Sequence, residues 1–166
     1  MGGGKGKKSG ARGGGFPWRR LALVSLLGNL ILLFVLLWLR PAEKGEEGVL
    51  DFVDRYFRTW SEQDMAGYEA CFHPQATIYY VSGEGEASGM TLEPFIKSQV
   101  MAHENAAERM REYPLESVVD IDGNVARVLT RWNLVKGASE ETGTDYFTLL
   151  RGKDGWLIVN LVFKKD

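Results

Sequence analysis

Apolar and polar positions divide the chain into three parts. Residues 1–20 are glycine-rich and polar, residues 21–39 (LALVSLLGNLILLFVLLWL) contain no charged side chain, and residues 49–166 mix apolar and polar positions throughout. A helix rises about 1.5 Å per residue, so the uncharged stretch would span roughly 28 Å, close to the hydrocarbon core of a bilayer. We therefore predict a transmembrane helix over residues 21–39, a polar linker over residues 40–48 and one folded domain over residues 49–166.

The folded domain begins with helical patterns. Apolar residues recur at helical spacing over residues 49–60, which predicts a strongly amphipathic helix. Asp64 can cap a second, short helix, and Thr91 can cap a longer helix that runs through about Arg111. The expected inner stripe of this longer helix consists of Phe95, Ile96, Val100, His103, Ala107 and Met110.

The remaining patterns predict strands. Residues 75–81 are β-branched and aromatic, and from residue 115 onward the pattern changes to a period of two. Residues 122–124 (DGN) and residues 152–155 (GKDG) separate successive strands, as hairpin turns do. Helices first and antiparallel strands after them predict an α+β domain with the helices on one face of the sheet.

Charge is distributed unevenly along the chain. Residues 1–40 contain seven lysines or arginines and no acid, whereas residues 41–166 contain 13 basic and 22 acidic side chains. Since lysine and arginine are retained on the cytoplasmic side of a membrane, we expect a cytoplasmic N-terminus and an extracytoplasmic domain, periplasmic if the membrane is a bacterial inner membrane. A reporter enzyme fused after Asp166, active only outside the cytoplasm, would test this orientation. The acidic domain lacks the basic stripe that nucleic acid requires, so nucleic acid is not an expected partner.

The alternative for the apolar stretch is a cleaved signal peptide. The apolar region of such a peptide is normally shorter than residues 21–39 and ends in a site of the A-x-A type, whereas this one ends in residues 38–42 (WLRPA). We therefore expect the stretch to be retained as a single-pass anchor in the lipid bilayer. The basic tail, residues 1–20, is too poor in apolar side chains to fold and is expected to be disordered.

Candidate metal and redox chemistry is sparse. The single cysteine, Cys71, cannot form an internal disulfide, and no group of cysteines and histidines has the spacing of a metal site. We expect no metal and no cofactor.

Four short sequence words follow one another along the domain. They are Trp60-Ser61-Glu62-Gln63-Asp64, Phe72-His73-Pro74-Gln75-Ala76, Asp145-Tyr146-Phe147-Thr148-Leu149-Leu150 and Gly155-Trp156-Leu157-Ile158-Val159-Asn160. These words and the order of the elements resemble the nuclear transport factor 2-like (NTF2-like) superfamily, in particular its lumazine-binding-like or SnoaL-like branch. The resemblance covers about residues 49–163 and implies a cone-shaped domain, in which a curved antiparallel sheet wraps round three helices and leaves a pocket. The superfamily includes isomerases, dehydratases, cyclases, transport factors and non-catalytic domains, so the fold implies no single function.

The ketosteroid isomerases of this superfamily offer a test of one reaction. Their chemistry uses a carboxylate base and an oxyanion site made of a tyrosine and a protonated aspartate. The resemblance assigns Tyr56 and Asp145 to the positions of that tyrosine and aspartate, and it assigns Tyr80 to the position of the base. A phenol with a pKa of about 10 is a poor proton acceptor at neutral pH, so this isomerisation is not expected.

Five residues are candidates for the wall of the pocket. His103 belongs to the inner stripe of the longer helix, and Trp132 shares the apolar face of its strand with Val128 and Leu134. Each could instead be an ordinary residue of the core, as could Tyr56. The ligand-binding candidates are Tyr56, Tyr80, His103, Trp132 and Asp145.

Two functions from different classes remain open. The first is a non-catalytic small-molecule-binding or assembly module at the outer face of a membrane, with a small, largely apolar ligand. The second is a small-molecule isomerase or dehydratase that uses His103 or Asp145 for proton transfer.

The last predicted strand also suggests a partner. Alternation along residues 156–163 assigns Trp156, Ile158 and Val162 to one side and Leu157, Val159, Leu161 and Phe163 to the other, so both sides are apolar. A half-solvated strand should be polar on one side. We therefore predict a homodimer through the outer face of the sheet.

Overall fold

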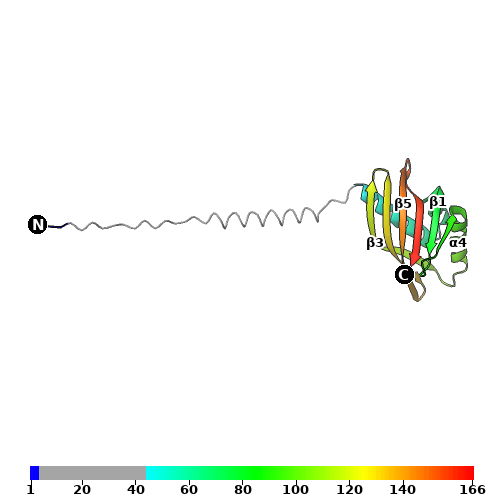
Figure 1. The fold of residues 1–166 in the computed structure, drawn as a ribbon. Helices are drawn as coiled ribbons and strands as arrows, with labels where there is room; N and C mark the ends of the chain where they lie inside the picture. The colour runs from blue at the N-terminus through cyan, green and yellow to red at the C-terminus, as the bar shows by residue number, and fades with distance from the viewer. Residues whose placement is uncertain (4–43) are drawn as a thin grey trace. The chain divides into compact units, whose positions relative to one another are not determined.

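The computed structural model describes residues 1–3 and 44–166 (Figure 1). The predicted transmembrane helix, residues 4–20 of the basic tail and residues 40–43 of the linker lie outside the described residues, so the anchor and its orientation stay predictions. Within the described residues, no helix is both long enough and apolar enough to cross a membrane. The first helix of the folded unit begins at Lys44, five residues before the expected boundary of the domain.

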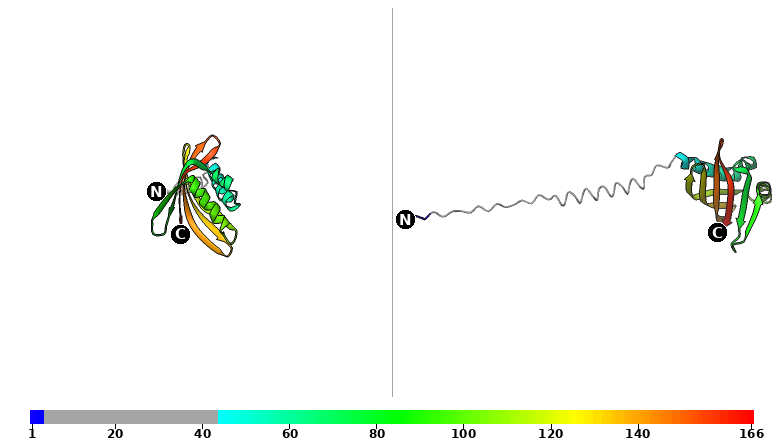
Figure 2. Two further views of the ribbon diagram at one scale, coloured as in Figure 1. Left: turned by 90° about the vertical axis from the view of Figure 1, so that its right-hand side faces the viewer. Right: turned by 45° about the horizontal axis from the view of Figure 1, so that its top comes forward.

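In residues 44–166, three helices and six strands make up the domain. The helices are α2 (Lys44–Ser61), α3 (Met65–Glu69) and α4 (Leu92–Glu104). The strands are β1 (Phe72–Val81), β2 (Ala87–Thr91), β3 (Met110–Asp122), β4 (Val125–Lys136), β5 (Ser139–Gly152) and β6 (Gly155–Lys165). The expected α+β class is therefore confirmed, with helices α2 and α4 on one face of a curved sheet (Figure 2).

The six strands form one sheet in the order β2-β1-β6-β5-β4-β3. All neighbouring pairs are antiparallel except β1 and β6, which are parallel. The expectation of a purely antiparallel sheet was therefore wrong. The reason is the order of pairing: β2 folds back onto one edge of β1, so the last strand of the meander adds to the free edge of β1 and runs in the same direction.

Helix α2 is built as its pattern predicts. Its apolar stripe is buried, with no member more than 5% exposed: Val49, Phe52, Val53, Tyr56, Phe57 and Trp60. Asp64 caps α3 as expected, because its carboxylate accepts a hydrogen bond from the backbone N–H of Gly67 at 2.9 Å. This arrangement turns one side of α2 toward the inner face of the sheet.

Helix α4 is shorter than its pattern predicts. It ends at Glu104 rather than near Arg111, and Ala107 lies exposed in the loop that follows. Met110 and Arg111 instead begin β3, where they pair with the end of β4. The spacing of Ala107 and Met110 fits a helix, but strand pairing with β4 decides the structure of this segment.

Strand β6 contains a bulge, and the residues beyond it face the side of the sheet opposite to the one that strict alternation predicts. Thr148 pairs with Asn160 and Leu149 with Ile158, so Val159 is an extra residue in β6. Beyond the bulge, Leu161 and Phe163 therefore share the inner face with Trp156 and Ile158, contrary to the strict alternation expected from the sequence. The outer face of β6 is accordingly less apolar than that alternation suggests.

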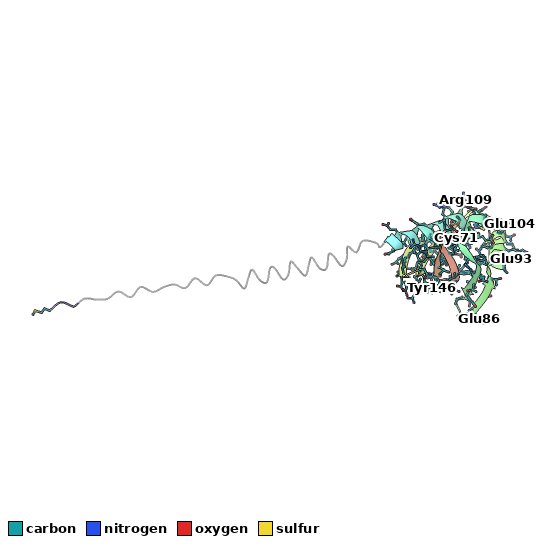
Figure 3. All side chains as sticks on the ribbon, turned by 90° about the horizontal axis from the view of Figure 1, so that it is seen from above. Cys71, Glu86, Glu93, Glu104, Arg109 and Tyr146 are labelled. Atoms are coloured by element: carbon teal, nitrogen blue, oxygen red, sulfur yellow. The ribbon has the colours of Figure 1, made fainter. Side chains whose placement is uncertain are left out.

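The outer face of the sheet carries one apolar row across five strands. Successive pairing partners in this row are Tyr79, Val162, Tyr146, Leu129 and Val118. All except the half-buried Val162 are more than a third exposed. The pairing makes Tyr146, which is labelled in Figure 3, the central member of this outer apolar row.

Candidate functional site

A cavity of about 250 Å³ opens between the helices and the inner face of the sheet. This volume is slightly below the roughly 300–1,000 Å³ usual for drug-sized ligands, so its occupant must be small. Every helix and four of the strands contribute to its wall. The lining residues are Tyr56, Trp60, Tyr68, Phe95, Gln99, Ala102, Met110, Glu112, Trp132, Leu134, Lys136, Asp145, Leu161, Phe163 and Lys165.

Two tyrosines stand together in this wall. Tyr56 lies on the buried stripe of α2, and Tyr68 lies on the short helix that Asp64 caps. The hydroxyl of Tyr68 donates a hydrogen bond to the hydroxyl of Tyr56 at 2.9 Å, and both side chains are at most 3% exposed. Burial raises the pKa of both phenols well above their ordinary value, so both stay neutral and can donate hydrogen bonds.

The sheet brings a tryptophan and an aspartate to the same cavity. Trp132 on β4 donates a hydrogen bond from Nε1 to Oδ1 of Asp145 on β5 at 2.8 Å, and both side chains are 3% exposed. Gly143 pairs with Trp132 across the ladder and makes room for the indole, because a Cβ at position 143 would overlap the ring. The indole therefore lies flat across β5 and fixes the aspartate within the sheet.

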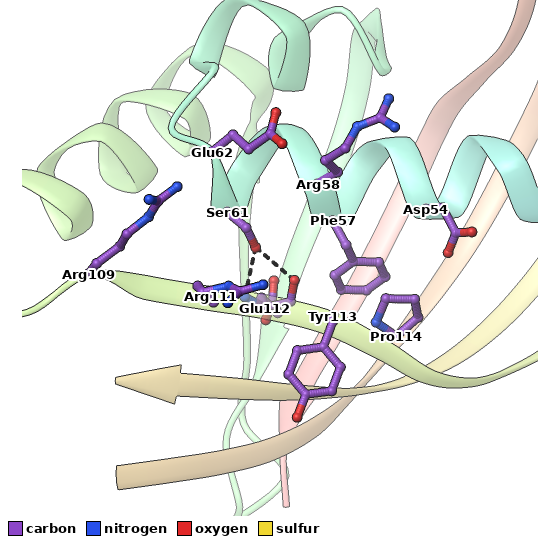
Figure 4. A pocket seen from close by; sticks show the side chains of 10 residues that line it. All are labelled: Asp54, Phe57, Arg58, Ser61, Glu62, Arg109, Arg111, Glu112, Tyr113 and Pro114. Atoms are coloured by element: carbon purple, nitrogen blue, oxygen red, sulfur yellow. Dashed lines mark hydrogen bonds between the residues drawn. The ribbon is translucent and has the colours of Figure 1, made fainter. Parts of the chain in front are cut away.

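A second carboxyl group, that of Glu112, also lines the cavity. Ser61 at the end of α2 holds the start of β3: its hydroxyl donates to the backbone oxygen of Glu112 at 2.7 Å and accepts from the backbone N–H of Glu112 at 2.8 Å (Figure 4). On β3, Glu112 pairs with Leu134, which is another residue of the cavity wall. The double hydrogen bond thus fixes Glu112 beside the cavity.

Burial makes both carboxyl groups weak acids. It raises the pKa of Asp145 to about 7, although the hydrogen bond from Trp132 and the polar hydroxyl of Tyr56 oppose the rise. Burial raises the pKa of Glu112 well above its ordinary value, and the negative charge of Asp145 raises it further. Two carboxyl groups that share a dry site cannot both ionise readily, so the pair retains a proton near neutral pH. At that pH the cavity wall offers both proton donors and proton acceptors.

A wider groove of about 440 Å³ lies where α2 meets β3 (Figure 4). Arg58, Arg109 and Arg111 line it, and all three are exposed to solvent. Glu112 also lines this groove, but Asp145 and the paired tyrosines, whose pKa values burial raises as well, line only the smaller cavity. We therefore assign the candidate functional site to the smaller cavity around Glu112 and Asp145.

The structure brings three of the five candidate residues together. Tyr56, Trp132 and Asp145 all line the cavity, but Tyr80 and His103 are not part of its wall. The ring of Tyr80 packs at 5.3 Å against the ring of Phe163, which itself lines the cavity. His103 packs at 4.3 Å against Trp60 and lines a separate groove formed mainly by residues 62–63 after α2 and residues 106–109 after α4. Since burial lowers the pKa of His103, its imidazole is neutral at pH 7, away from Asp145.

Sequence reasoning missed Glu112. With the longer helix extended through Arg111, Glu112 fell into an expected loop. One signal could have found it: Glu112 is two residues from the apolar Met110, the period of a strand. Within residues 1–3 and 44–166, no three His, Cys, Asp or Glu side chains gather closely enough to hold a metal ion.

Comparison with sequence families gives one match. A family model described as "Putative lumazine-binding" matches residues 44–164, which is essentially the whole folded unit. No curated protein matches the chain.

Comparison with solved structures identifies the same fold in several bacterial proteins. An NTF2-like protein of unknown function from Shewanella baltica is 18% identical, with a TM-score of 0.55 over 72% of this chain and 92% of that chain. A putative dehydratase from the NTF2-like family of Streptomyces avermitilis is 13% identical, with a TM-score of 0.61 over 72% and 94%. ActVI-ORFA from Streptomyces coelicolor is 18% identical, with a TM-score of 0.58 over 72% and 96%. At these identities the likeness shows the fold alone.

Proposed function

This chain belongs to the family described as putative lumazine-binding and has the NTF2-like fold, and we propose that its domain binds a small molecule in the cavity around Glu112 and Asp145. The observation that carries the proposal is the composition of the cavity wall. A few polar groups converge among aromatic and aliphatic side chains, which is the usual composition of a ligand site. In the part of the chain with described side chains, the two carboxyl groups whose pKa values burial raises, those of Glu112 and Asp145, both belong to this wall.

The polar groups of the cavity wall determine which chemical groups a ligand must present. Tyr68 gives its hydroxyl hydrogen to Tyr56, so the donors left for a ligand are the hydroxyl of Tyr56 and a protonated carboxyl group, which suit an acceptor oxygen such as a carbonyl. The rings of Trp60 and Trp132 suit a flat ring system. The ligand is therefore a small ring compound that presents an acceptor to the carboxyl pair.

Substitution of Tyr56 by phenylalanine tests this proposal. Loss of its hydroxyl in a dry site is expected to weaken binding by roughly 1–3 kcal/mol, because the acceptor of the ligand loses its partner. Isothermal titration with a ligand found by thermal-shift screening measures the effect. Tyr80→Phe is the matched control, since it removes a phenolic hydroxyl outside the cavity wall. Equal affinities of the parent and Tyr56→Phe would refute the role of this tyrosine.

A second candidate function is proton-transfer catalysis, favoured by the presence of two carboxyl groups with raised pKa values in the wall of one cavity. In a dehydration, one carboxylate would take a proton from a carbon next to a carbonyl, and the other carboxyl would protonate the departing hydroxyl, which leaves as water. One solved structure with this fold is titled a putative dehydratase. Deuterium exchange into a bound ligand that stops in Glu112→Gln would support this function, and no exchange by the parent would exclude it for that ligand.

The outer apolar row supports the prediction of a homodimer. A two-fold axis through Tyr146 would lay the row of one copy on the row of a second copy. The flanking rows contain charges of both signs, with Asp120 paired to Arg127 on one side and Glu116 next to Arg131 on the other. A rotated copy therefore meets no large patch of like charge. We propose that a second copy of this chain covers the outer apolar row.

Tyr146→Lys should dissociate this dimer. A buried lysine at the centre of the row is expected to weaken self-association by roughly 30-fold, or about 2 kcal/mol. Sedimentation equilibrium of residues 42–166 measures the change. Met101→Lys is the control, because Met101 is an exposed apolar residue of α4, away from the sheet. A parent fragment that stays monomeric at high micromolar concentration would rule out the dimer.

A further inference from the structure

Two lysines meet one glutamate at the edge of the cavity. Lys136 ends β4, Glu141 lies near the start of β5, and Lys165 ends β6. These strand ends are neighbours, because Lys136 pairs with Ser139 across the hairpin and Lys165 pairs with Gly143. Lys136 donates to Glu141 Oε1 at 2.9 Å, and Lys165 donates to Glu141 Oε2 at 2.6 Å.

Both lysines also belong to the cavity wall. Their side chains are 31% and 49% exposed, so the ammonium groups lie where the cavity opens to solvent rather than at its buried end. The buried end is formed by Tyr56, Trp132 and Asp145, each 3% exposed. The cavity thus has a dry aromatic end and a cationic mouth.

The mouth has an excess of positive charge. Two ammonium groups share one carboxylate, and the lysines lower the pKa of Glu141, so it is ionised at neutral pH. Each ammonium has three N–H donors and gives one to Glu141, which leaves two on each lysine for another acceptor. The other charged side chains of the cavity wall are Glu112 from β3 and Asp145 from β5. At pH 6 those two carboxyl groups hold protons and cancel little of the positive charge.

We propose that the ligand of this cavity is an anion: a small ring compound whose ring lies among the aromatic side chains and whose carboxylate, or a similar group, binds Lys136 and Lys165. The inference rests on the proposed binding function and adds the charge of the ligand. Exposed ion pairs contribute only about 0–1 kcal/mol to folding, so the fold does not require a second lysine on Glu141. Binding of an anionic ligand at the mouth explains why a second lysine is present. The apolar wall beside the mouth limits the screening of charge by water, which strengthens the attraction between the lysines and an anion.

A matched pair of probes separates charge from shape. The probes are 2-naphthoate and 2-naphthamide, which have the same ring and nearly the same size but differ in charge. The full chain in detergent micelles is titrated with each probe by calorimetry at pH 6, with protein-free micelles subtracted. We expect the parent to bind the carboxylate about tenfold more tightly than the amide, which corresponds to about 1.4 kcal/mol.

Variants test whether the preference for the carboxylate probe arises from Lys136 and Lys165 at the mouth of the cavity. The double variant Lys136→Met/Lys165→Met should reduce the ratio of the two affinities to about one. Glu141→Gln should increase the ratio, because it removes the competing carboxylate and leaves both lysines in place. Lys153→Met in the turn between β5 and β6 is the control, since it removes an exposed lysine elsewhere and should leave the ratio unchanged.

Each other outcome overturns the inference in a distinguishable way. Equal binding of both probes by the parent would refute an anionic ligand and leave the proposed binding function intact. Tighter binding of 2-naphthylmethylammonium would show that the ionised carboxyl groups dominate the cavity, again refuting the inference alone. Binding of no probe would count against both the anionic ligand and the proposed function. A tenfold preference that survives the double lysine variant would move the anion site elsewhere, for example to the arginine-lined groove between α2 and β3.

Discussion

Replacing Asp145 with asparagine will remove much of the pH dependence of this protein's stability between about pH 4 and pH 7. Burial raises the pKa of Asp145 from 3.8 to about 7 in the folded state. The folded state therefore binds this proton more tightly than the unfolded chain does. Its contribution to stability is fully present below pH 3.8 and is lost as the pH rises through about 7. At about 1.4 kcal/mol for each pH unit, the difference corresponds to roughly 4 kcal/mol.

Urea unfolding of the parent and the variant at pH 5 and at pH 8 measures this effect. The parent should be the less stable at pH 8, and Asp145→Asn should show a much smaller difference between the two pH values. Glu112 contributes in the same direction, so Glu112→Gln combined with Asp145→Asn should reduce the difference further. His103 has the opposite effect, because its lowered pKa reduces the stability of the folded state as the pH falls. The parent and the variants all contain His103, so its effect cancels when their pH dependences are compared.

An exposed carboxylate provides the control for this experiment. Asp120→Asn removes a surface partner of Arg127 and should leave the pH dependence as it is in the parent. A parent whose stability does not change, or increases, from pH 5 to pH 8 would contradict the buried protonated pair.

Gly143→Ala is expected to destabilise the domain by roughly 3 kcal/mol or more. A Cβ at this position would overlap the indole of Trp132 and also crowd the backbone oxygen of Lys164. Overpacking of this kind costs about 1–3 kcal/mol. Displacement of the indole would also break its hydrogen bond to Asp145, which leaves a buried polar group unsatisfied at a further cost of about 1–3 kcal/mol.

Gly152→Ala is the matched control for this substitution. It makes the same change in the same strand, but its Cβ would meet only one atom, at an ordinary contact distance of 3.7 Å. Thermal unfolding of both variants measures the difference. If Gly143→Ala proved as stable as Gly152→Ala, the indole of Trp132 would not be held against Gly143.

The sequence predicts those elements whose signal is local. The buried stripe of α2 and the two hairpin turns around Gly123 and Gly155 are confirmed, because helical spacing and glycine at positive φ are decided within a few residues. The parallel pair of β1 and β6 depends on a partner distant in the chain, and the bulge at Val159 depends on the register with β5, which no local spacing reveals. The end of α4 is also decided by strand pairing, since pairing of Met110 with β4 overrides the helical spacing of Ala107 and Met110.

The sequence is limited in the same way when it is used to predict which single side chains line the candidate site. Periodicity tells which face of a helix or strand a residue occupies, but it does not tell how far along that face the cavity extends. Tyr80 lies on the inner face of β1 and packs against Phe163, yet only Phe163 lines the cavity. Glu112 was missed for the related reason that its strand begins earlier than the sequence suggests.

The indole N–H resonance of Trp132 reports on the proposed ligand site, because this group donates a hydrogen bond to Asp145 within the cavity wall. Trp156 is an internal reference, since it packs against Arg151 in a separate groove. Addition of 2-naphthoate to the ¹⁵N-labelled full chain in detergent micelles should shift the Trp132 indole signal and leave that of Trp156 in place. A probe that binds and shifts Trp156 instead, or that leaves Trp132 unmoved, would show that the cavity around Glu112 and Asp145 is not the ligand site.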